Sequence, residues 1–253
     1  MTLHHADDLA TFTLQGAHLT SWQPAGHEPV LWMSSSTRWE TGEVLRGGVP
    51  VCWPWFGAHP DGGARHGFVR TLVWTLLGVT ERPEHLTVSF GLDVNGTEDP
   101  RWPYRARVEF QAEFGADLTL RLLTRNTDGR PFTFTEALHT YFQVGDIGRV
   151  EVAGPEGEVR FSGEVDQVFE GTTASCVIRD PSLGRQLRID KSGSASTVIW
   201  NPGEARARLL GDLGDELHRN FVCVESGNVR GDAVTLAPGA THTLAVVYTV
   251  ARL

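Results

Sequence analysis

Residues 104–127, YRARVEFQAEFGADLTLRLLTRNT, decide the fold class of this 253-residue chain. In their first half every second residue is apolar or aromatic, and polar residues stand between them. A period of two is typical of a half-buried antiparallel strand, whereas an amphipathic helix repeats about every 3.6 residues. A second apolar run follows the turn-forming segment Gly115-Ala116-Asp117. The stretch therefore predicts a β-hairpin.

The same alternation extends outward from this hairpin and predicts an all-β chain. Clusters of Gly, Pro and Asp separate the expected strands, and the helical turns that we expect are confined to residues 201–220. No internal repeat or linker divides the sequence, so we expect one domain over residues 1–253, a large antiparallel β-sandwich or a barrel. The other expected strands cover residues 11–14, 18–22, 30–33, 69–77, 85–94, 132–144, 197–200, 221–224 and 242–250.

Composition and charge exclude several classes of function. The formal net charge is −9, with no basic tail or stripe, so we expect neither a nucleic acid nor a membrane as partner. The first residues lack a secretory signal, and the three cysteines have neither CxxC nor histidine spacing. We therefore expect a cytoplasmic, monomeric protein with reduced thiols and no metal or cofactor.

Residues 46–70, RGGVPVCWPWFGAHPDGGARHGFVR, form the first segment that packing alone does not explain. Prolines remove donors from a strand ladder and glycines weaken strand interiors, so we expect a long ordered loop. Arg46, Arg65, His66 and Arg70 stand in this loop. Guanidinium groups around glycine-rich backbone suit phosphate or carboxylate, although solvated surface arginines paired with acids remain the alternative.

Residues 135–143, TEALHTYFQ, place His139 in the middle of an expected strand. Phe134, Leu138 and Phe142 share the apolar side, so we expect His139 to face a polar or mixed surface with an ordinary pKa near 6.5. It is either a structural histidine with satisfied nitrogens or a proton-transfer group.

Glu225 ends a second apolar strand in FVCVESGNV, residues 221–229. A carboxylate in such a place is costly unless it is paired, protonated or open to a site, and a strand-end surface residue is the alternative. Taken with His139, it offers an acid and a base on a rigid β scaffold.

Seven segments follow one another along the chain: GAHLTSWQPAG with PVLWMS, RGGVPVCWPWFG, RHGFVR, EALHTYFQVGDI, VDQVFEG, VIWNPG and FVCVESGNV. In this order they resemble the D-hexose-6-phosphate mutarotases, or glucose-6-phosphate 1-epimerases, of the aldose 1-epimerase superfamily. The resemblance implies a β-sandwich of the galactose mutarotase type and exchange of the α and β anomers of a hexose 6-phosphate without a cofactor.

The resemblance also implies roles for individual residues. His139 and Glu225 match the catalytic histidine and carboxylate, with Glu225 as base and protonated His139 as acid. The family commonly has Gln where this chain has Arg65, which leaves open whether that residue strengthens phosphate binding or alters the sugar accepted. The expected substrate-binding residues are Arg46, Arg65, His66, Arg70 and Asp166.

Two other functions remain open at this point. One is a mutarotase for unphosphorylated aldoses, and the other is a non-catalytic carbohydrate-binding β-sandwich, because one fold can carry many functions. The expected partner in each case is a small sugar or sugar phosphate, and the sequence does not fix the preferred hexose.

Overall fold

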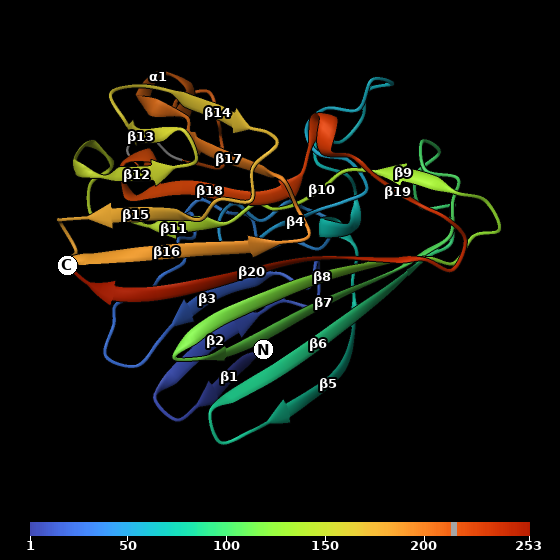
Figure 1. Ribbon diagram of the computed structural model, residues 1–253, viewed down its shortest axis with the longest axis horizontal. Helices are drawn as coiled ribbons and strands as arrows, with labels where there is room; N and C mark the ends of the chain where they lie inside the picture. The colour runs from blue at the N-terminus through green and yellow to red at the C-terminus, as the bar shows by residue number, and fades with distance from the viewer. Residues whose placement is uncertain (214–216) are drawn as a thin grey trace.

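The computed structural model describes residues 1–213 and 217–253. Its largest layer is a nine-stranded antiparallel sheet, which crosses Figure 1 from β13 and β12 at the upper left to β5 at the lower right. The last strand in the sequence, β20, lies in the middle of this sheet with four strands on either side. In spatial order the strands are β13 (Gly157–Arg160), β12 (Glu151–Gly154), β15 (Cys176–Asp180), β16 (Arg185–Ser192), β20 (Thr241–Arg252), β8 (Asp117–Asn126), β7 (Ala106–Gly115), β6 (His85–Val94) and β5 (Thr75–Glu81).

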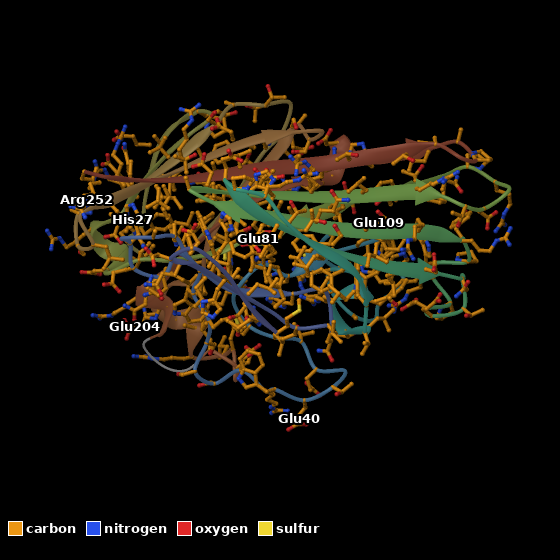
Figure 2. The ribbon with its side chains drawn as sticks, turned by 90° about the horizontal axis from the view of Figure 1, so that it is seen from below. His27, Glu40, Glu81, Glu109, Glu204 and Arg252 are labelled. Carbon is orange, nitrogen blue, oxygen red and sulfur yellow. The ribbon has the colours of Figure 1, made fainter. Side chains whose placement is uncertain are left out.

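The hairpin predicted from residues 104–127 is confirmed as β7 and β8, which pair from Ala106 opposite Asn126 to Phe114 opposite Leu118. Val108 and Phe110 are fully buried, whereas the intervening Glu109 is partly exposed and lies beside the sheet in Figure 2. Each large apolar side chain buried in this way contributes about 1.5–3 kcal/mol. The two-residue alternation therefore fixes which face of the sheet is buried.

A second antiparallel sheet packs against the first across a shared hydrophobic core. All eight residues of its central strand β18 are buried. Phe142 of this sheet meets Tyr248 of β20 with ring centroids 5.0 Å apart, which joins the two layers. In order the strands are β14 (Val165–Phe169), β17 (Ser196–Asn201), β18 (Phe221–Asn228), β10 (Glu136–Leu138) and β4 (Val51–Cys52), and β11 (Tyr141–Gln143) pairs with another part of β18. The expected large antiparallel sandwich is confirmed.

Two small sheets and a few helical turns complete the described fold. In Figure 1, α1 lies at the upper left above β17 and β18, and β9 with β19 lies at the right. The small sheets are β1 (Thr2–His5), β2 (Asp8–Phe12) and β3 (Leu19–Gln23), and β9 (Phe132–Phe134) with β19 (Val234–Leu236). The helical segments are α1 (Gly203–Ala207) and the 3-10 turns η1 (Val69–Thr71), η2 (Ile147–Arg149), η3 (Leu217–Asn220) and η4 (Arg230–Asp232).

Several expected elements differ in the structure. The single strand expected over residues 132–144 is wrong: it is divided into β9, β10 and β11, which pair with three different sets of partners. Residues 69–77 begin as the 3-10 turn η1, and residues 30–33 form isolated bridges through Leu31 and Met33. Helical turns also occur outside residues 201–220, as η1, η2 and η4. Apolar residues continue through the breaks in residues 132–144, so periodicity alone could not locate those breaks.

Residues 46–70 are irregular apart from β4 and the start of η1, as expected. The loop folds back on itself through hydrogen bonds from the His66 amide to the Gly57 carbonyl, 2.7 Å, and from the Phe68 amide to the Trp53 carbonyl, 3.2 Å. Gly67 has a φ of +71° and lies so close to Trp53 that an added Cβ would be 1.8 Å from the carbonyl oxygen. The position between His66 and Phe68 therefore requires glycine.

No helix among residues 1–213 and 217–253 has the length and apolar character needed to cross a lipid bilayer.

The close approach at Gly67 predicts a large difference between two glycines of this loop. Gly57 has a similar φ of +75°, but an added Cβ there meets nothing within 4 Å. We expect Gly57→Ala to lower the free energy of unfolding by about 1–2 kcal/mol, the cost of the left-handed backbone. Gly67→Ala should cost at least about 3 kcal/mol, because the Trp53 backbone must also move. Urea unfolding of both variants measures the difference, and equal losses would contradict this account of the loop.

Candidate active site

His139 and Glu225 lie side by side, both buried, at the six-stranded sheet. The His139 Nδ1 atom lies 3.4 Å from Oε1 of Glu225. His139 is 8% exposed and Glu225 is 1% exposed. The contact lacks hydrogen-bond geometry, and Nδ1 of His139 and Oε2 of Glu225 have no hydrogen-bond partner among the described residues. An imidazole and a carboxyl are thus held side by side with lone pairs available.

The backbone explains why these two residues meet. Strands β10 and β11 both pair with β18, Leu138 opposite Ser226 and Tyr141 opposite Cys223. His139 and Thr140 lie at the bend between them, so His139 is not in the middle of a strand as expected. The His139 amide donates to the Pro50 carbonyl at 3.0 Å, which fixes the bend to the loop of residues 46–70. The bend therefore places His139 beside Glu225.

Three aromatic rings surround the His139 imidazole. The Tyr141 ring stacks on it almost in parallel, at 6° with centroids 4.9 Å apart. Trp200 and His66 approach it edge to face, at 6.0 and 5.4 Å. Offset stacking and edge contacts both stabilise aromatic pairs. These contacts hold the imidazole plane in one orientation.

Burial shifts the pKa values of both groups in the direction that favours their uncharged forms. Desolvation lowers the pKa of His139 well below its ordinary value, and the positive charges of Arg46 and Arg70 add to this effect. Desolvation raises the pKa of Glu225 well above its ordinary value, and the charge of Asp166 adds to it. The expectation of an ordinary histidine pKa near 6.5 is therefore wrong, because the imidazole is buried rather than on a polar surface.

The two shifts leave one dissociable proton on the pair. A neutral imidazole with a protonated carboxyl has the same proton count and net charge as an imidazolium with a carboxylate. The two forms differ only in which of the two groups holds that proton. The pair thus contains one proton donor and one proton acceptor in either form.

Arg46 is tied into the site by two partners. Its Nη1 donates to the Tyr141 hydroxyl at 3.0 Å, and its guanidinium forms an ion pair with Asp212 at 2.9 Å. Ser34 donates to the Asp212 backbone carbonyl at 2.7 Å, which joins two loops on this side. Glu40, in the loop that follows Ser34, and Glu204, in α1, lie on the side opposite the nine-stranded sheet in Figure 2. Arg46 is therefore largely neutralised and positions Tyr141.

Arg70 differs from Arg46 because no carboxylate neutralises it within ion-pair distance among residues 1–213 and 217–253. Among the described residues its side chain makes one hydrogen bond, from Nη2 to the Arg65 carbonyl at 2.6 Å, and its buried Nε has no partner there. Burial lowers the pKa of this guanidinium, as desolvation of an unpaired cation should. Arg70 consequently presents unused donors and positive charge.

His66, Arg65 and Asp166 occupy the edge of the site. His66 is half-buried, and desolvation together with Arg70 and Arg65 lowers its pKa to about 3. Arg65 is exposed. Asp166 is exposed on β14, opposite Trp200 of β17, and its charge reaches Glu225. The charges of the residues expected from the sequence therefore act on one another at this site. The arginines act on the two histidines, and Asp166 acts on Glu225.

Four further residues lie at this site, namely Tyr141, Trp200, Asp212 and Cys223. Tyr141 stood on the expected His139 face, two residues further on, so the alternation could have indicated it. Trp200, Asp212 and Cys223 carried no such signal, because their positions depend on the pairing of distant strands. Cys223 is fully buried, and its sulfur with His139 and Glu225 gives a set of ligand atoms within 4.8 Å of one another.

The described residues also line a cavity of about 610 Å³ beside α1. Its lining comes from α1, η2 and the segment before β14, and it includes Asn201, the residue after Trp200. None of the seven expected site residues lines it. Glu164, Arg206 and Arg219 give it a wall of mixed charge.

Known proteins resemble this chain along most of its length. The model of the aldose 1-epimerase family matches residues 1–162 and 154–249. A protein of Salmonella typhimurium, named provisionally as a glucose-6-phosphate 1-epimerase, is 36% identical over 244 residues, which cover 89% of this chain and 82% of that protein. A protein of Escherichia coli K12 with the same name has the same identity and coverage. The crystal structure of YeaD from Salmonella typhimurium, described provisionally as a mutarotase, has a TM-score of 0.92 at 33% identity and covers 100% of this chain and 90% of its own.

The burial of His139 predicts a neutral imidazole at pH 6.5, where an ordinary histidine is half protonated. Because its pKa is lowered, the unfolded chain takes up this proton first as the pH falls below 6.5. The contribution of His139 to the free energy of unfolding should therefore decline in that range. Histidine-selective ¹⁵N NMR, with His139→Asn to assign the signal, measures the titration. A His139 midpoint at or above pH 6.5 would contradict the effect of burial.

Proposed function

The chain belongs to the aldose 1-epimerase family, and from this premise we propose that it is an isomerase that interconverts the α and β anomers of a hexose 6-phosphate. The observation that carries the proposal is the 3.4 Å contact between His139 and Glu225. Glucose 6-phosphate is the first substrate to test, because the relatives in Salmonella typhimurium and Escherichia coli are provisionally named for it.

Anomer exchange needs two proton transfers at neighbouring oxygens. The proton of the C1 hydroxyl leaves while another is added to the ring oxygen, the bond between C1 and that oxygen breaks, and C1 becomes a carbonyl. Rotation about C1–C2 and the reverse transfers close the ring on the other face. Both oxygens are bonded to C1, so the donor and acceptor must lie next to each other. The adjacent imidazole and carboxyl meet this requirement.

We assign Glu225 as the base and protonated His139 as the acid, with exchanged roles on ring closure. This ion-paired form has the same proton count as the neutral form that burial favours, so it is reached when one proton moves from Glu225 to His139. Each positioned proton-transfer group typically accelerates a reaction by about 10²- to 10⁴-fold. Tyr141, stacked on the imidazole and hydrogen-bonded to Arg46, keeps the acid oriented.

Arg70 supports a phosphorylated substrate rather than a free aldose. A half-buried guanidinium without a carboxylate partner is costly unless an anion completes its hydrogen bonds. Its planar fork suits paired bonds to phosphate oxygens. Arg65, exposed nearby, supplies a second positive charge in place of the amide that the family commonly has there. Asp166 and His66 are proposed to bind sugar hydroxyls, and Arg46, paired with Asp212, to position Tyr141.

Two other functions fit these observations less well. A free aldose has no anionic group that would compensate the positive charge of Arg70. A non-catalytic sugar-binding sandwich leaves unexplained why an imidazole and a carboxyl are buried in contact, at the desolvation cost of two ionisable groups.

The first test removes one proton-transfer group at a time. We expect Glu225→Gln and His139→Ala each to lower the rate of anomer exchange by about 10²- to 10⁴-fold, because each removes one transfer. Two-dimensional exchange NMR on glucose 6-phosphate measures the rate directly. Glu136→Gln is the matched control: Glu136 is fully buried three residues from His139, but its carboxylate contacts His242 at 3.3 Å. Near-normal exchange in Glu225→Gln or His139→Ala would refute the assignment.

A second test asks whether Arg70 binds the phosphate. We expect Arg70→Gln to lower kcat/KM on glucose 6-phosphate by about 10- to 100-fold, the usual value of hydrogen bonds to a charged group, and to change activity on free glucose little. Arg82→Gln is the control, because Arg82 is exposed beside β5, outside the site. An equal loss on both sugars would show that Arg70 has a structural role instead.

A further inference from the structure

Cys223 stands on the same side of β18 as Glu225, because residues two apart on a strand point the same way. Its sulfur, Nδ1 or Nε2 of His139 and a carboxylate oxygen of Glu225 lie within 4.8 Å of one another. Anomer exchange gives the thiol no role. The cluster therefore contains a ligand type that the proposed chemistry leaves unused.

We propose that His139, Cys223 and Glu225 form an inhibitory binding site for a thiophilic divalent cation, with Zn²⁺ as the representative ion. Thiolate, imidazole and carboxylate are the three ligand types that zinc takes in proteins, and three protein ligands leave a fourth position for water or a sugar hydroxyl. Hard cations such as Mg²⁺ prefer oxygen ligands alone, so they should not bind here.

The ligand atoms are available and nearly in place. Nδ1 of His139 and Oε2 of Glu225 are buried without a hydrogen-bond partner among the described residues. Ligands around tetrahedral zinc lie about 3–4 Å apart, so atoms already within 4.8 Å need side-chain shifts of about 1 Å. The stacked Tyr141 ring and the backbone of β18 hold the cluster in position.

Charge balance also favours a divalent ion. The thiol of Cys223 carries one proton and the His139–Glu225 pair carries one more. A divalent cation that displaces both leaves the net charge of this buried site unchanged, and the two protons pass to solvent. No unpaired charge is then left in the interior, which is the condition that burial imposes.

Inhibition follows because the ion occupies both proton-transfer groups. That consequence rests on the proposed function, whereas binding of the ion does not. The two are therefore separable: absence of anomer exchange in the metal-free protein refutes the function, and absence of binding refutes the metal site.

The binding test uses Zn²⁺ in competition with a chromophoric chelator, and Co²⁺ as a spectroscopic substitute. We expect one Zn²⁺ per chain, and with Co²⁺ a thiolate charge-transfer band that Cys223→Ser abolishes. Cys223→Ser should weaken Zn²⁺ binding at least tenfold, whereas Cys176→Ser, which removes another buried thiol on β15, should not. Glu225→Gln should weaken binding as well and serves if Cys223→Ser does not fold. Binding unchanged in both Cys223→Ser and Glu225→Gln would overturn the site.

The activity test follows exchange on glucose 6-phosphate during Zn²⁺ titration. Zn²⁺ should inhibit the wild-type protein, EDTA should restore the rate, and Mg²⁺ should have no effect. With each protein compared with its own metal-free rate, Cys223→Ser should need at least tenfold more Zn²⁺ for half inhibition than the wild-type protein. Equal sensitivity of Cys223→Ser and the wild-type protein would overturn the proposal.

Discussion

The structure depends on the pairing of two short strands with one buried partner. Strands β10 and β11 both pair with β18, and the bend between them holds His139. Each ladder fixes one end of the bend, and hydrogen bonds to Pro50 and Gly48 carbonyls fix it from the other side. Because Glu225 is on β18 itself, the contact between imidazole and carboxyl follows from backbone pairing. Side-chain attraction alone would not set that distance, since burying both groups is costly.

Burial then determines how the two groups behave. The same desolvation moves the pKa of His139 down and that of Glu225 up, so the pair keeps one dissociable proton instead of two charges. The positive residues around it divide into two kinds. Arg46 is compensated by Asp212 and orients Tyr141, whereas Arg70 keeps unused donors. Arg46 thus has a structural role, whereas Arg70 has unused donors that can bind an anion.

The sequence predicted those parts of the fold in which local pattern and tertiary environment agree. Alternation located β6, β7 and β8 because each has one buried and one half-exposed face. It failed over residues 132–144, because apolar residues continue through the bend at His139 and periodicity carries no signal for a change of partner. The family resemblance indicated the seven expected site residues, but Asp212 and Cys223 approach the site through pairings that no local pattern specifies. The ordinary pKa expected for His139 failed for the same reason: burial is a property of the assembled sheets.

The position of β20 has a consequence for how the nine-stranded sheet forms during synthesis. The strand closest to the C-terminus is also the one that joins the two halves of the nine-stranded sheet. Until it emerges, β5 to β8 and the group of β12, β13, β15 and β16 are separate sheets with unpaired edges. Such non-local pairing slows folding and exposes strand edges to wrong partners. The nascent chain therefore exposes the edges of β8 and β16 until β20 has been synthesised and has paired with both.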